Sequence, residues 1–202
     1  PALREHAVAL DDLVTLPDGR LALLIEQVDG PVLVDVLAAR RGGLALGEAV
    51  TLVAPLAEAL EAAHAVGLTS IDLSPSTVRV RTSGAPVVVR LQQARVGPVL
   101  PQRLRDLEPA YAADRAALAR LGAAVADAVA EPERAGLIAA LRVAELDRPL
   151  ASALFDLAEP LPLRLDGVGG DAPDRVSAVG IEGEFASPAQ ESPAALLVDA
   201  SG

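Results

Sequence analysis

The sequence predicts an α+β fold that is mainly helical, with two small antiparallel hairpins. Its longest periodic segments are rich in Ala and Leu, which favour helices. Its strand-like runs are short and lie in pairs around turn signals. With 202 residues, of which 51% are hydrophobic and 22% charged, the chain is long enough for one domain with an aliphatic core.

The first elements are expected to be a hairpin and a short helix. Apolar-rich runs at residues 8–15 and 20–26 flank Pro17-Asp18-Gly19, a strong turn signal. A short helical pattern follows at residues 32–40 and is closed by two glycines, Gly42 and Gly43.

A long Ala- and Leu-rich helix is expected over residues 46–66, with Gly67 as a left-handed cap. His64 lies near the end of this helix, where packing or capping is a better interpretation than general-base chemistry. A second hairpin is expected from residues 78–81 and 87–91, around a Ser-Gly turn.

Three further helical patterns complete the expected fold. The first begins at Asp114, and an acidic residue at a helix N-terminus is favoured by the helix dipole. The second spans residues 132–146, with a proline near its first turn, and the third spans residues 149–158.

The composition changes after Pro160, which predicts a domain over residues 1–165 followed by a linker over residues 166–202. The linker is rich in Gly, Pro, Ser and Ala and carries seven acidic residues and one arginine. Such a segment is expected to be disordered, the alternative being an ordered extension on the domain surface.

The overall composition excludes several classes of function. The net charge of −11 argues against a nucleic-acid partner, which requires clustered positive charge. The chain has no Cys, which fits a reducing compartment, and no apolar run of the roughly 18 residues that span a bilayer. All 17 basic residues are Arg, because the chain contains no Lys; it also contains no Asn.

The most informative segment reads GLTSIDLSPSTV over residues 67–78. It resembles the catalytic loop of the protein kinase family, in which the corresponding run is G-I-V-H-R-D-L-x-P-x-N-I. Asp72 stands at the position of the catalytic base, and Pro75 at the turn that follows it. Ser70 stands where the family has His, and Thr77 where it has the metal-holding Asn.

Other segments resemble the same family in the same order. The run RLQQAR from Arg90 lies where the family has D-F-G-L-A-R, so Arg90 replaces a metal-binding Asp. The run LIEQVDG over residues 24–30 resembles the kinase hinge, L-x-E-Y-V-x-G. The resemblance makes Ile25 the gatekeeper and gives Glu26 and Val28 backbone groups for an adenine.

The resemblance covers residues 5–160 and implies a kinase-like large (C-) lobe with a hinge hairpin, a catalytic-loop hairpin and a truncated N-lobe. His64 and Gly67 match the family's H-x-x-G, and Asp114 matches an aspartate that anchors the catalytic loop. Only 24 positions separate Arg90 from Asp114, so the activation segment is short. No A-P-E motif is present, and Glu108-Pro109-Ala110 is a poor substitute.

The resemblance implies a catalytically impaired, bacterial Ser/Thr-kinase-like domain, a pseudokinase. Kinases neutralise the transferred phosphate with Mg²⁺ held by the residues that Thr77 and Arg90 replace. We therefore expect no metal site and weak or absent binding of ATP with Mg²⁺. The expected role is a regulatory or protein-binding module of a larger signalling protein. The alternatives are an active Ser/Thr kinase that uses Asp72 as the base and a non-kinase helical adaptor.

Partners and location follow from the same resemblance. The expected partners are proteins, including true Ser/Thr kinases and phosphothreonine-reading domains. The expected location is the cytoplasm, including the cytoplasmic part of a membrane-linked parent protein, with no membrane contact by this segment.

Two placements of Arg90 are open. Strand alternation can turn its side chain into the cleft, where a guanidinium would pair with the Asp72 carboxylate and replace the missing cation. It can equally turn the side chain outward, onto a solvated face.

Overall fold

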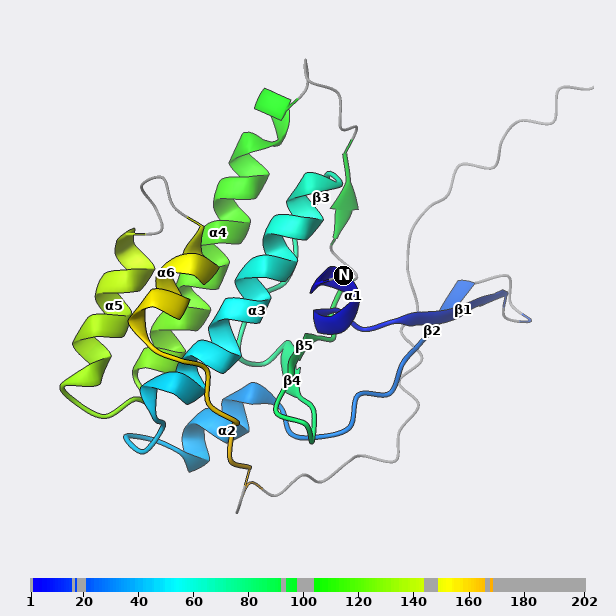
Figure 1. Ribbon diagram of the computed structural model, residues 1–202. Coiled ribbons are helices and arrows are strands. Elements are labelled where there is room, and N and C mark those ends of the chain that lie inside the picture. Colours follow the sequence, from blue (N-terminus) through cyan, green and yellow to red (C-terminus); the bar gives the residue numbers. More distant parts are fainter. Residues whose placement is uncertain are drawn as a thin grey trace, which may run out of the picture.

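The computed structural model describes residues 2–15, 17, 21–91, 94–97, 104–143, 149–165 and 168. Its helices are α1 (Ala2–His6), α2 (Leu33–Ala39), α3 (Leu46–Ala65), α4 (Leu104–Ala126), α5 (Glu133–Val143) and α6 (Leu150–Leu157). Its strands are β1 (Leu10–Thr15), β2 (Leu21–Ile25), β3 (Leu68–Thr69), β4 (Val78–Val80), β5 (Pro86–Val88) and β6 (Arg95–Val96). The fold is α+β, as predicted, with small antiparallel sheets beside the helices (Figure 1).

The long helix α3 lies at the centre of the helical body. It contacts α1 on one side and α4 and α6 on the other, while α5 packs against α4 and α6 (Figure 1). Most of its Ala, Leu and Val side chains are buried, which is why this helix is rich in apolar residues along its whole length. The predicted boundaries of α2, α3 and α6 are correct to within one residue.

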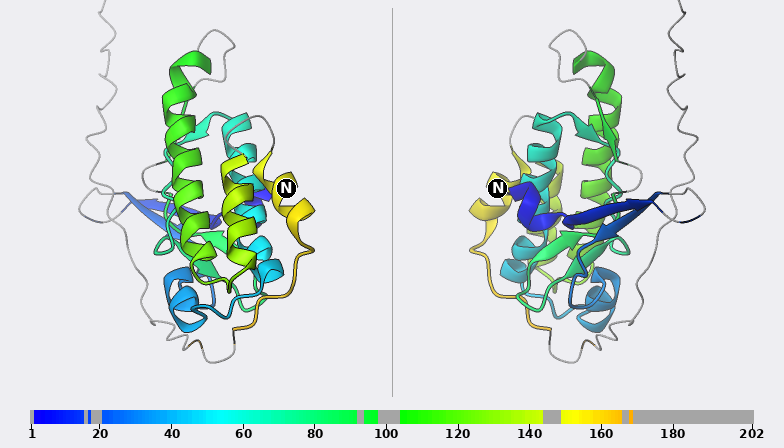
Figure 2. Two further views of the ribbon diagram at one scale, coloured as in Figure 1. Left: turned by 90° about the vertical axis from the view of Figure 1, so that its left-hand side faces the viewer. Right: turned by 90° about the vertical axis from the view of Figure 1, so that its right-hand side faces the viewer.

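The first predicted hairpin is confirmed as the antiparallel pair β1–β2, with Leu13 opposite Leu23 in register. It extends away from the helical body (Figures 1 and 2). Its side chains Leu13, Leu24 and Ile25 are exposed, at 52%, 41% and 40%. Asp18 and Gly19 of the predicted turn, and residue 20 of the second predicted run, lie outside the described part of the chain.

The second predicted hairpin is confirmed as β4–β5. Isolated bridges extend it on both sides, from Ala7 to Val88 and from Val32 to Arg79, so it joins the N-terminal segment to the chain entering α2. A third pair, β3–β6, is only two residues long in each strand. Strands this short carry no periodic pattern, and the sequence did not predict them.

The helix expected to begin at Asp114 begins ten residues earlier, at Leu104, so that prediction is wrong. The sequence Glu108-Pro109-Ala110 lies inside α4 and does not end a loop. Pro109 is the sixth residue of this helix, so its missing N–H leaves one carbonyl of the first turn without its internal hydrogen bond. Asp114 is therefore a mid-helix residue, and the helix dipole does not explain its place.

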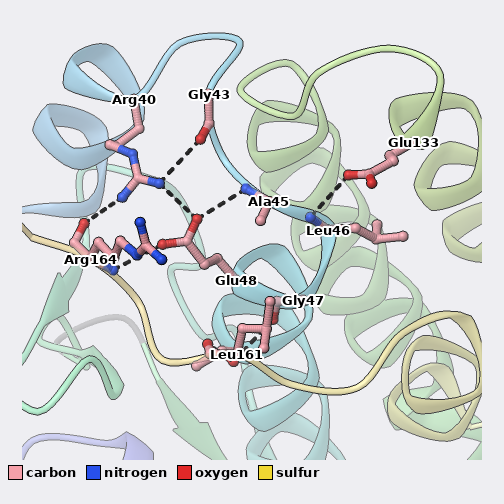
Figure 3. Close-up of polar contacts among 10 residues, drawn as sticks. Arg40, Gly43, Ala45, Leu46, Gly47, Glu48, Glu133, Leu161 and Arg164 are labelled. Atoms are coloured by element: carbon pink, nitrogen blue, oxygen red, sulfur yellow. Dashed lines mark hydrogen bonds and ion pairs between the residues drawn. The ribbon is translucent and has the colours of Figure 1, made fainter.

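A buried carboxylate fastens the chain that follows α6 to the start of α3 (Figure 3). Glu48, 3% exposed, accepts the backbone N–H groups of Ala45 at 3.0 Å and Arg164 at 2.9 Å. It also pairs with the guanidinium of Arg40 at 2.7 Å. The chain near Leu161 thereby lies against α3, where Gly47 leaves room for it.

The predicted linker over residues 166–202 lies outside the described residues, except for Val168. Within the described part, no helix combines the length and the apolar character needed to cross a membrane.

Candidate functional site

The loop that follows α3, residues 67–77, is here called the Asp72 loop. Gly67 has a φ of 76° and turns the chain out of the helix, after which β3 pairs with β6. Ser70 also has a positive φ, 60°, which is uncommon for a residue with a side chain. Such a backbone persists only where surrounding contacts fix it.

Asp114 supplies those contacts from α4. Its Oδ2 accepts the backbone N–H of Ser70 at 3.0 Å, and its Oδ1 accepts that of Ile71 at 3.1 Å. The side chain is 3% exposed. Hydrogen bonds to a buried carboxylate are stronger than neutral ones at the surface, so this residue holds the loop from beneath.

The same carboxylate contacts His64 of α3. The His64 Nε2 lies 3.1 Å from Asp114 Oδ2, and the imidazole ring lies against Tyr111 with ring centroids 4.3 Å apart. The Tyr111 hydroxyl donates to the carbonyl oxygen of His64 at 3.2 Å. His64 is thus held between α3 and α4 by packing and polar contacts. The sequence argument missed Tyr111, although its spacing of three residues from Asp114 places both on one helix face.

Thr77 closes the Asp72 loop on itself. Its hydroxyl donates to the carbonyl oxygen of Asp72 at 2.6 Å and accepts the backbone N–H of Ser74 at 2.9 Å. The side chain is only 1% exposed. Its hydroxyl oxygen is therefore used in hydrogen bonds within the turn, as Ser and Thr side chains often are, and is not directed at a ligand.

A cleft of about 530 Å³ separates the Asp72 loop from α4. Its walls are formed by Ser70, Ile71, Asp72, Leu73, Ser74, Pro75, Ala113, Asp114, Ala117, Arg120 and Leu121. Asp72 is partly exposed there. Within the described ranges, its carboxylate has no hydrogen-bond or ion-pair partner.

Arg90 has the outward placement. It follows β5 with an exposed side chain, and it forms no ion pair with Asp72 in the part of the chain that is described. The inward placement is therefore wrong. An unpaired guanidinium is better solvated in water than in a cleft, and no buried partner compensates for that loss here.

The three residues assigned to the hinge lie at the junction of the first hairpin and the body. Ile25 is 40% exposed and Val28 is buried. The backbone N–H of Glu26 donates to the carbonyl oxygen of Ala9 at 2.9 Å, and the Val28 carbonyl accepts a hydrogen bond from Arg79 at 3.4 Å. These main-chain groups thus have partners inside the protein.

The Glu26 side chain is paired as well. Its carboxylate lies 2.6 Å from the guanidinium of Arg81. The hydrogen bond from Arg81 lowers the pKa of Glu26, and the same bond raises the pKa of Arg81. The sequence argument did not single out Arg79 or Arg81, although their alternation along the second hairpin was visible.

The chemical capacity of the site is narrow. One carboxylate, Asp72, faces the cleft without a partner in the described residues, and the other acid that lines the cleft, Asp114, is engaged by the loop backbone. Among the described residues, no three His, Asp or Glu side chains gather as a possible metal site.

Comparison with known proteins does not extend this description, because no family model matches the chain and no curated protein matches it significantly.

Proposed function

We propose that this chain is the large-lobe core of a protein kinase-like fold that has lost phosphotransfer. In this proposal it serves as a regulatory or protein-binding module of a larger signalling protein, and it binds ATP and Mg²⁺ weakly or not at all. The observation that carries the proposal is the carboxylate of Asp114 beneath the Asp72 loop. It binds two backbone N–H groups 43 and 44 positions away along the chain.

That contact is specific enough to favour a kinase-like core over a chance helical adaptor. The resemblance pairs an anchoring aspartate with a catalytic loop, and Asp114 and the Asp72 loop are such a pair. A helical adaptor gives no reason for a buried mid-helix aspartate to hold a strained Ser70 backbone. The two hairpins and the cleft beside Asp72 add support.

The loss of phosphotransfer is supported at the two positions that hold metal in kinases. The oxygen of Thr77 is engaged in its own loop, and Arg90 offers a positive charge instead of a carboxylate. Without metal, the charge of a transferring phosphoryl group stays uncompensated. Losing one such electrostatic stabiliser costs on the order of 10²–10³ in rate.

One observation favours the second candidate, an active Ser/Thr kinase. The Asp72 carboxylate is partly exposed beside the cleft and has no partner in the described residues, which is the condition a general base requires.

Phosphotransfer by the full chain distinguishes the two candidates. We expect no transfer from ATP to a Ser/Thr peptide library above the background of an Asp72→Asn variant, with Mg²⁺ or Mn²⁺ present. We also expect a calorimetric titration with ATP to give the same weak signal with and without a chelator.

Asp72→Asn is the matched control, because it preserves shape and removes only the charge of an unpaired side chain. Metal-dependent transfer that disappears in Asp72→Asn would establish the active kinase. Tight ATP binding that collapses on chelation would contradict the proposed loss of the metal site.

A further inference from the structure

Two arginines lie on the side of β4 that faces away from the helical core. Val78 and Val80 are fully buried against the core, and Arg79 between them is partly exposed. Arg81, the next residue in the alternation, is also partly exposed. Because successive side chains of a strand point to opposite faces, Arg79 and Arg81 share the outer face of the second hairpin.

Both arginines bind the segment that connects β2 to α2, residues 26–31. Arg79 donates to the carbonyl oxygens of Gly30 at 2.8 Å and Val28 at 3.4 Å. Arg81 pairs with the Glu26 carboxylate at 2.6 Å. Each guanidinium thus binds an acceptor of this segment.

Further contacts hold the same segment close to β4 and its turn. The Thr82 hydroxyl donates to the Asp29 carboxylate at 2.7 Å, and the Val80 N–H donates to the Pro31 carbonyl at 2.9 Å. Gly30 has a φ of 106°, and a Cβ there would clash with the Val80 carbonyl oxygen. Only glycine allows this approach, so the segment is fitted to β4 along its length.

We propose that Arg79 excludes purine nucleotides from this segment because it binds the main-chain carbonyls of the segment itself. Arg81 holds the segment in place. The inference rests on the proposed function, in which the segment is a kinase-like hinge. A purine is recognised there through main-chain groups, and Arg79 is bound to carbonyls of the same segment, to Gly30 at 2.8 Å and more weakly to Val28 at 3.4 Å. The charge-assisted bond to the Gly30 carbonyl, at 2.8 Å, holds the guanidinium against the segment, and a purine could reach these main-chain groups only by displacing it.

The experiment uses adenosine, which probes the hinge groups without phosphate or metal. In ligand-observed NMR titrations of the full chain, the parent should show no saturable binding at millimolar adenosine. Arg79→Leu should show saturable binding at millimolar adenosine, because the guanidinium no longer occupies the Gly30 and Val28 carbonyls. Hydrogen exchange of the amides in residues 26–30 should accelerate by about tenfold, with α3 unchanged.

Two variants complete the design. Arg79→Gln keeps a donor but loses the charge, and should give a smaller gain; it also replaces Arg79→Leu if that variant does not fold. Arg41→Leu removes an exposed arginine elsewhere and should match the parent.

The outcomes separate this inference from the proposed function. Folded Arg79 variants that bind adenosine no better than the parent, or that exchange no faster in residues 26–30, overturn the role of Arg79 alone. Chelator-sensitive, tight ATP binding by the parent overturns the proposed function, whatever the Arg79 variants do.

Discussion

Two buried carboxylates in this protein bind backbone N–H groups in the same way, at opposite ends of helix α3. Asp114 binds two backbone N–H groups and the His64 ring near the C-terminal end of α3. Glu48 binds two backbone N–H groups and the Arg40 guanidinium at the N-terminal end of α3 (Figure 3). Both residues are 3% exposed.

The difference lies in what each carboxylate holds. Glu48 secures a helix start and the chain after α6, where the backbone is otherwise ordinary. Asp114 secures the strained Ser70 backbone and lines the cleft beside Asp72. Hydrogen bonding by a buried carboxylate therefore stabilises the start of α3 at one end of the helix and positions the Asp72 loop at the other.

Removal of the Asp114 carboxylate should have the largest effect. Asp114→Ala leaves the buried N–H groups of Ser70 and Ile71 without acceptors, and each such loss costs about 1–3 kcal/mol. We expect the free energy of unfolding to fall by about 3–5 kcal/mol, measured by urea denaturation of the full chain.

The exposed Asp127, just beyond the same helix, is the matched control, and Asp127→Ala should change stability by less than about 0.5 kcal/mol. Equal effects of the two substitutions would show that Asp114 does not hold the loop.

Removal of the charge at Glu48 should have a smaller effect. Glu48→Gln keeps an acceptor for one N–H group and loses the ion pair with Arg40, so we expect a loss of about 2–3 kcal/mol. Glu58→Gln, an exposed position on the same helix, should be neutral in the same urea experiment. A loss of stability no larger than that of Glu58→Gln would show that the charge of Glu48 does not stabilise this end of α3.

The Glu48 network should also be sensitive to acid. Burial raises the pKa of Glu48, but the hydrogen bonds from Ala45, Arg164 and Arg40 together outweigh burial and leave the pKa below its ordinary value. A carboxyl whose folded pKa is lowered stabilises the fold above its unfolded pKa, near 4.3, and that stability is lost as the pH falls through the folded pKa.

The difference in stability between the parent and Glu48→Gln should therefore be full near pH 6 and should shrink below about pH 4. A difference that stays constant over this range would mean that the charge of Glu48 contributes nothing.

The two networks also differ in how far the sequence revealed them. Asp114 was found because it matches a family aspartate that anchors the catalytic loop, although its helix was expected to start ten residues too late. Glu48 was not found, because its partners Arg40 and Arg164 are 8 and 116 positions away and no local rule joins them.

The elements themselves were easier to predict than the contacts between them. Apolar periodicity and glycine stops located α2, α3 and both hairpins, because those signals are local. The side of the strand to which Arg90 turns could not be decided from alternation alone. The binding of Arg79 to Gly30 likewise depends on a close approach of two segments that only the folded chain brings together.

Within the Asp114 network, the Tyr111 hydroxyl should contribute modestly. Tyr111→Phe removes the hydrogen bond to the His64 carbonyl and keeps the ring contact, so we expect a loss of about 1 kcal/mol. Tyr111→Ala also removes the ring from a buried position and should cost about 3–5 kcal/mol in the same urea experiment. Equal losses for the two variants would mean that the ring does not support His64.

The smallest effect should come from the cleft itself. Asp72 has no partner among the described residues, and Arg90 is exposed, so Asp72→Ala and Arg90→Ala should each change the free energy of unfolding by less than about 0.5 kcal/mol. In a double-mutant cycle the two changes should add within about 0.3–0.5 kcal/mol, as they do for residues that share no contact. A coupling of about 1 kcal/mol or more would instead require an ion pair between them in solution. It would restore Arg90 as the cation that replaces the metal, whereas additivity would leave the Asp72 carboxylate free to meet a partner.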